Sequence, residues 1–297
     1  MQSSGSSWAA TASATSGSTP ARSRFALRAR SVALDLRVDA VRRDLADIRM
    51  ADRVFAPHYA VPARRTAGRL VVVAGTPDGV PLSQLLPGEP FDVLEFTSTH
   101  AWGRSPVDGV VGFVDCDSLT GEFPSSHIVI AKYAPVHADA SSTSPVLAQL
   151  PMGARVAATP SGDDWVEVDG GYVAANTVVS REDAGGDAVA FALALRNVAA
   201  VTGGRSGDGV DAAGLIFLTH ALAGAPPARF ADLQSATIGT PLAEGDVLRR
   251  GDLIFFADHV VMLVDGDTAI HVDDVVKCEA LATLDRFGPV VARRRPA

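Results

Sequence analysis

Two histidines near the C-terminal end of the chain have a spacing that could do chemistry. His259 and His271 are 12 residues apart in successive β-type runs, as the facing strands of one hairpin would place them. An imidazole pair on adjacent strands can act as a general base, hold a ligand's carboxylate or bind a metal. Asp258, Asp273 and Asp274 would complete a His/carboxylate cluster for zinc, but this spacing is not diagnostic. The plain alternative is a structural role for both histidines, and we predict no metal and no cofactor.

The segments around these histidines predict a domain of helices followed by a sheet over residues 187–297. Apolar residues at helical spacing come first, and β-type runs with tight Asp/Gly connections come last. This order is typical of an α+β fold. The expected elements are a helix over 187–197, a glycine-rich turn over 203–209, a buried helix over 215–222, and β runs over 251–256, 259–264 and 268–272.

The middle of the chain contains a tandem repeat of short β runs. A Leu-Pro turn with a following glycine, a tryptophan strand and a Gly-(Phe/Tyr)-Val strand occur in this order twice. The repeat predicts two small all-β barrels, over 67–119 and 127–179. The layout resembles bacterial SH3-like domains, which commonly bind peptidoglycan peptides or dock beside a catalytic domain. Trp102 and Trp165 are candidate ligand-binding residues, although a half-buried barrel tryptophan is the more frequent case. In the first copy the expected strands are 70–73, 91–96, 101–104 and 110–114.

Five ordered motifs in the last 110 or so residues resemble NlpC-type papain-like cell-wall peptidases. The resemblance implies a papain-like α+β domain that hydrolyses an amide bond in the peptidoglycan stem peptide. The motifs are Gly203-Gly204, Asp211-x-Ala213-Gly214-Leu215, Gly251–Phe256, His259-Val260-Val261-Met262 and Ile270-His271-Val272.

The same resemblance implies a catalytic thiolate–imidazole pair at the start of the second helix. A cysteine there would have its pKa lowered by the helix dipole and by a nearby imidazolium. By position, His259 would be the general base, and His271 would orient its ring. Ala212 occupies the nucleophile position. The covalent route is therefore closed in the chain as written.

The turn before this helix also departs from the family pattern. The family's tyrosine falls at Ala200 and its tryptophan at Thr202, so we expect weaker stabilisation of an oxyanion as well. These losses together favour a naturally degenerate domain over a Cys-to-Ala variant of an active enzyme. We predict that Asp211, Gly203 and Gly204 still contribute to ligand binding.

Neither cysteine is expected to replace the missing nucleophile. Cys116 and Cys278 have no metal-type spacing, and neither is at the helix start that faces the base in the family. We expect two free thiols in a reducing compartment, with a single disulfide as the alternative. Cys278 is expected to be a small core residue.

Charge, apolar runs and the N-terminal segment limit the classes of partner and the cellular location that we expect. The net charge of −8 argues against a nucleic-acid partner. No apolar run approaches the roughly 18 residues of a membrane-spanning helix. Residues 1–55 are expected to be a disordered tail with a short helix over 35–50, without a secretory signal, which makes the cytoplasm the default location.

Three functions follow from these observations. The leading hypothesis is a catalytically inactive NlpC homologue that binds cell-wall stem peptide or a protein partner. The second is an active cysteine endopeptidase in a Cys-to-Ala form. The third is an assembly protein that uses the fold as a scaffold.

Overall fold

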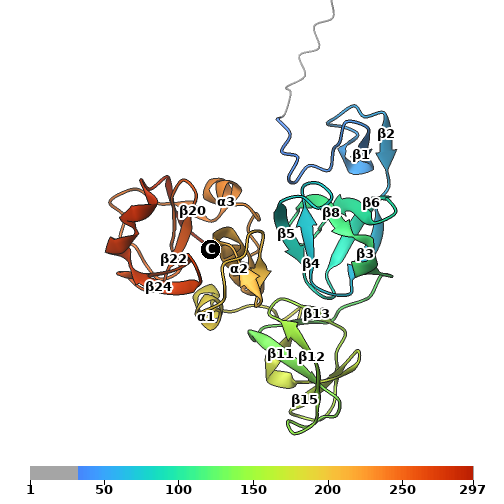
Figure 1. The fold of residues 1–297 in the computed structure, drawn as a ribbon. Coiled ribbons are helices and arrows are strands. Elements are labelled where there is room, and N and C mark those ends of the chain that lie inside the picture. The colour runs from blue at the N-terminus through green and yellow to red at the C-terminus, as the bar shows by residue number, and fades with distance from the viewer. Residues whose placement is uncertain (1–32, 297) are drawn as a thin grey trace, which may run out of the picture. The chain divides into compact units, whose positions relative to one another are not determined.

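The computed structural model describes residues 33–296 (Figure 1). The predicted helix over 35–50 is wrong. This segment contains turns, the short strand β1 (Leu45–Asp47) and the 3-10 helix η1 (Ile48–Met50), and β1 pairs in parallel with β2 (His58–Ala60). Ala40 and Leu45 pack in the cluster of Trp102 while Leu36 and Ile48 are exposed, so tertiary contacts override the local helical spacing. The predicted disordered tail over residues 1–32 lies outside the described residues.

The next segment, residues 63–120, forms a seven-stranded sheet that we call the first β module. The four strands expected from the repeat are confirmed as β4, β6, β7 and β8. The sheet order is β5-β4-β8-β7-β6-β3-β9, and its end strands do not pair, so the predicted closed barrel is not seen in the described residues. The strands are β3 (Ala63–Ala67), β4 (Val71–Ala74), β5 (Pro81–Leu85), β6 (Pro90–Phe96), β7 (His100–Arg104), β8 (Val111–Asp115) and β9 (Leu119–Thr120).

Residues 127–180 form a second β module with a core of its own, in which buried valines dominate. Its strands make two sheets, ordered β12-β11-β16-β15-β14 and β13-β10-β17, again without closure among the described residues. The strands are β10 (His127–Val129), β11 (Tyr133–His137), β12 (Val146–Pro151), β13 (Arg155–Val156), β14 (Thr159–Pro160), β15 (Trp165–Val168), β16 (Gly171–Ala174) and β17 (Val178–Ser180).

The C-terminal domain, residues 187–296, has the predicted helix-then-sheet order. Helix α2 (Ala212–Leu222) is apolar on nearly all sides and buried, and it packs against β22 and β23 of a six-stranded antiparallel sheet. The sheet order is β20-β25-β21-β22-β23-β24. The other elements are α1 (Ala188–Ala194), α3 (Ala231–Thr237), η4 (Leu281–Phe287), β18 (Arg205–Ser206), β19 (Gly209–Val210), β20 (Thr240–Pro241), β21 (Leu253–Phe255), β22 (Val260–Leu263), β23 (Thr268–Val272), β24 (Val276–Ala280) and β25 (Ala292–Arg295). Among the helices of residues 33–296, none has the length and apolarity needed to cross a membrane.

Candidate functional site

The N-terminus of α2 is capped by Asp211 and begins with Ala212. One carboxylate oxygen of Asp211 accepts the backbone N–H of Gly214 at 2.6 Å, and the other accepts that of Gly203 at 3.0 Å. The cap satisfies backbone donors that a helix start leaves free, and it fixes the turn to the helix. Ala212 is half-buried and offers a methyl group where a reactive side chain would meet the helix dipole.

A buried arginine holds this cap. The guanidinium of Arg229 binds both carboxylate oxygens of Asp211, at 3.0 and 2.7 Å, and its side chain is 1% exposed. Its Nε–H donates to the hydroxyl of Ser83 at 3.2 Å. Because Ser83 is on β5 of the first β module, the start of α2 is joined to that module by charged hydrogen bonds.

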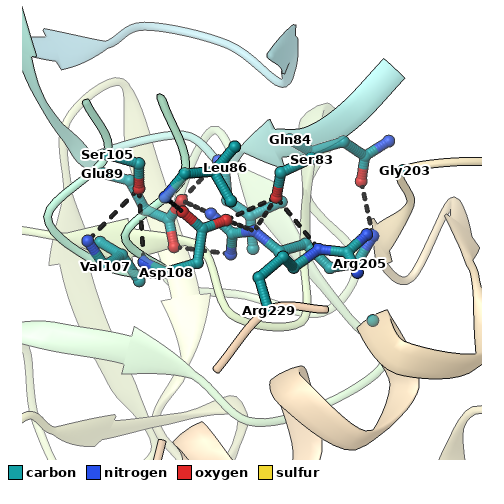
Figure 2. A network of polar contacts seen from close by, with 12 residues as sticks. Ser83, Gln84, Leu86, Glu89, Ser105, Val107, Asp108, Gly203, Arg205 and Arg229 are labelled. Carbon is teal, nitrogen blue, oxygen red and sulfur yellow. Dashed lines mark hydrogen bonds and ion pairs between the residues drawn. The ribbon is translucent and has the colours of Figure 1, made fainter. Parts of the chain in front are cut away.

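A second buried arginine extends the same network (Figure 2). Arg205, on β18, makes a bidentate pair with Glu89 and places its Nε 3.0 Å from a carboxylate oxygen of Asp108. Its backbone N–H donates to the side-chain carbonyl of Gln84 at 2.9 Å. The hydroxyl of Ser83 donates to Asp108 and accepts from Arg205. The contact between the two domains is therefore ionic, buried and continuous with the α2 cap.

The histidine pair is assembled as the hairpin spacing predicted. Nε2 of His259 lies 3.0 Å from Nδ1 of His271, so one of these nitrogens donates to the other. The ring of His259 stacks on Phe287 of η4, with centroids 3.8 Å apart and planes 15° apart. His271 is fully buried on β23. Since α2 packs against β22 and β23, the helix that begins at Ala212 contacts the strand that carries His271 and the strand that directly follows His259.

Both imidazoles are held in the neutral form. Burial, followed by the nearby His271, lowers the pKa of His259 to about 4. Burial also lowers the pKa of His271, against the opposing effect of Glu279. At neutral pH the pair thus consists of two uncharged rings that can accept a proton or a hydrogen bond.

Most of the other predicted ligand-binding residues are buried. Gly203 and Gly204 are buried, and a Cβ on Gly203 would lie 2.8 Å from the side chain of Pro81. Trp102 is buried, and the guanidinium of Arg42 lies 4.4 Å from the centre of its ring. Trp165, by contrast, is half-buried on β15. Gly203 thus meets the first β module, whereas a Cβ on Gly204 would meet backbone atoms of Gly209 and Val201 in its own turn.

The structure contains no activated thiol among residues 33–296. Cys116 and Cys278 are both free, and burial raises the pKa of each thiol. Cys278 is half-buried on β24 and packs against the core of the C-terminal domain, as expected. The described part of the chain also has no group of three or more His, Cys, Asp or Glu side chains arranged to hold a metal ion.

Sequence reasoning missed the arginines and the residues behind the histidines. Arg205 and Arg229 carry no motif, and only their presence among apolar and glycine-rich segments sets them apart. Phe287 and Glu279 lie on elements after the last recognised motif. Their roles depend on strand register and on packing between distant segments, which no local pattern reports.

Comparisons with known proteins identify the classes of these parts. Residues 200–284 match the NlpC/P60 family, and residues 72–119 match the bacterial dipeptidyl-peptidase Sh3 domain. The chain therefore contains an NlpC/P60 domain preceded by a bacterial SH3 domain. The second β module lies outside both matches, so its SH3-like nature remains a prediction.

Solved structures share this architecture at low sequence identity. An NlpC/P60 family protein from Bacillus cereus aligns with a TM-score of 0.69 and 16% identity over 78% of this chain and 99% of its own. An NlpC/P60 endopeptidase from Photobacterium damselae subsp. piscicida aligns with a TM-score of 0.52 and 9% identity over 77% of this chain and 70% of its own. These likenesses establish the fold alone. No curated protein matches the chain.

Proposed function

We propose that this protein is a non-catalytic relative of NlpC-type peptidoglycan endopeptidases that binds cell-wall stem peptide or a protein partner. The observation that carries the proposal is Ala212 at the first position of α2, in the domain that also holds an assembled histidine pair. A methyl group cannot attack a carbonyl carbon, so no acyl-enzyme can form. The neutral ring of His259 can still accept a hydrogen bond from a bound peptide.

The surroundings of the pair support binding without turnover. Both thiols have raised pKa values, so neither supplies a thiolate at neutral pH. The exposed positions 200 and 202 carry Ala and Thr, without the turn aromatics of the family pattern. The cap of α2 is nevertheless kept in place by Arg229. These features together fit a site that keeps its helix cap and histidine pair but lacks a nucleophile.

Binding is tested with purified sacculi and soluble stem peptides, by co-sedimentation and calorimetry on the full chain. We expect binding, and we expect His259→Ala to weaken it about three- to tenfold, the effect of one lost hydrogen bond. His58→Gln is the matched control, because His58 is an exposed histidine on β2. Absence of binding to both preparations would rule out the wall-binding role, and a stoichiometric protein captured instead would favour the assembly role.

The alternative function is a cysteine endopeptidase in a Cys-to-Ala form, and the assembled histidine pair favours it. Ala212→Cys restores the nucleophile at the helix start, with Ala212→Ser as a control of similar size. We expect no hydrolysis of muropeptides by either folded variant, because the turn lacks its aromatic residues as well. Turnover by Ala212→Cys alone would overturn the pseudoenzyme proposal.

The domain boundaries are part of the proposal. We assign 67–119 and 127–179 to two SH3-like domains and 187–297 to the NlpC-type domain. The separate core of the second β module supports its assignment as a folded unit. Its role would be to add binding surface to that of the NlpC-type domain.

A further inference from the structure

An unsatisfied ring nitrogen of His271 faces a carboxylate directly behind the histidine pair. Nε2 of His271 is buried without a hydrogen-bond partner in the described residues, and it lies 3.6 Å from Oε2 of Glu279, a buried carboxylate oxygen that pairs with Arg286. His271 itself is 0% exposed. Buried polar atoms without partners are rare in folded proteins, and each one needs an explanation. A shift of a few tenths of an ångström would close this gap to a hydrogen bond.

Strand register explains why these two side chains meet. In the antiparallel pair of β23 and β24, His271 lies opposite Lys277, and Ala269 lies opposite Glu279. Residues two apart on a strand share a face, so Glu279 is the diagonal neighbour of His271 on the same face. The strand register therefore places the carboxylate of Glu279 beside Nε2 of His271, the ring nitrogen that points away from His259.

Two cationic side chains stabilise the ionised carboxylate of Glu279. Nη1 of Arg286 on η4 lies 2.7 Å from Oε2, the oxygen that also faces His271, and Nζ of Lys277 lies 3.3 Å from Oε1. The hydrogen bond from Arg286 holds the pKa of Glu279 below its ordinary value. The group behind His271 is thus an ionised carboxylate, which can only accept hydrogen bonds.

The carboxylate of Glu279 determines which ring nitrogen of His271, Nδ1 or Nε2, carries the proton. If Nδ1 of His271 carried the proton, its Nε2 lone pair would face the carboxylate, and two buried acceptors would repel each other. If Nε2 carries the proton, it can donate to Glu279. Nδ1 of His271 then accepts Nε2–H from His259, and the hydrogen bond at 3.0 Å is satisfied.

We propose that Glu279 is a positioning residue that fixes the tautomers of both histidines. It holds the proton of His271 on Nε2 and thereby the proton of His259 on Nε2. Nδ1 of His259 is left as a bare lone pair, so a ligand at this ring must present a donor such as an amide N–H or a hydroxyl. The inference rests on the geometry of the pair and does not depend on the proposed wall ligand.

The test is the tautomer of His271 in the full chain, read from two-bond nitrogen–proton correlations of histidine-labelled protein at pH 7.5. The signals of His271 are assigned by their loss in His271→Gln. We expect a pyrrole-type Nε2 and a pyridine-type Nδ1, in more than about tenfold excess over the other form, which corresponds to about 1.4 kcal/mol. A wild-type His271 protonated on Nδ1 would overturn the proposal without any variant.

Variants test the cause. Glu279→Leu removes the acceptor, and we expect the excess to fall below about threefold or to reverse. Glu279→Gln keeps an acceptor oxygen and is expected to preserve the tautomer. Asp273→Asn is the matched control, because Asp273 also contacts Lys277 and Arg286. An unchanged tautomer in folded Glu279→Leu would show that Glu279 does not set it.

Discussion

Replacing Arg205 by methionine should strongly destabilise the protein through the buried network of Figure 2. The side chains of Arg205, Glu89 and Asp108 are 1%, 2% and 0% exposed. Arg205→Met removes the cation and leaves two carboxylates within the protein interior. Methionine fills a similar volume, so the variant isolates the loss of charge and hydrogen bonds from the loss of packing.

The expected cost follows from that burial. Removing one partner of a buried ion pair typically costs about 3–5 kcal/mol, because the remaining charge stays unsolvated. In a chain of this size, that loss corresponds to a fall in Tm of roughly 6–20 °C. Arg69→Met is the control, since the pair of Arg69 and Asp115 is 58% and 46% exposed. An exposed pair is worth about 0–1 kcal/mol.

Thermal unfolding followed by circular dichroism measures both variants. A third variant, Arg205→Met with Glu89→Gln and Asp108→Asn, removes the stranded charges and should recover part of the loss. If Arg205→Met costs no more than Arg69→Met, the argument that this interface depends on buried ion pairing is wrong.

Three further outcomes follow from the site. The pKa of His259 lies at about 4 in the folded chain, below its ordinary value of 6.5, so the unfolded chain binds the proton first. Stability should therefore fall by up to roughly 3 kcal/mol as the pH drops from about 6.5 to about 4 and then level off; urea titrations should show a flatter profile in His259→Gln. Asp211→Ala removes the α2 cap and leaves the buried Arg229 without its carboxylate, and chemical denaturation should show a loss of about 3–5 kcal/mol, whereas a loss of only about 1 kcal/mol would indicate capping alone. Gly203→Ala should lower Tm, because its φ of +73° disfavours other residues and its Cβ would meet Pro81 at 2.8 Å; an unchanged Tm would contradict this packing.

Local sequence patterns were sufficient to predict the helix and the strands that hold the candidate site. The helix after Asp211 and the hairpin of His259 and His271 are correct because each is encoded by nearby residues: a capping side chain, a continuous apolar run and β runs with tight turns. That Ala212 begins this helix can also be read from the chain alone, since it depends only on where the capping residue Asp211 stands.

Sequence reasoning was wrong where local and tertiary preferences compete. Apolar residues at helical spacing over 35–50 predicted a helix, but they are divided among turns, β1 and η1, where Leu45 packs beside Trp102 and Ile48 is exposed. The repeat predicted the strands of the first β module and also a closed barrel. Closure depends on whether β5 and β9 meet, and the order of the sheet leaves them apart.

The sequence by itself determined the helix-then-sheet domain, the histidine pair and the alanine at the start of α2. Only the tertiary structure decided what surrounds them. Arg205 meets Glu89 across 116 positions of the chain. Glu279 faces His271 because of strand register, which a one-residue slip would have reversed. Buried charges find partners by proximity in space, and proximity between distant segments is a property of the folded chain.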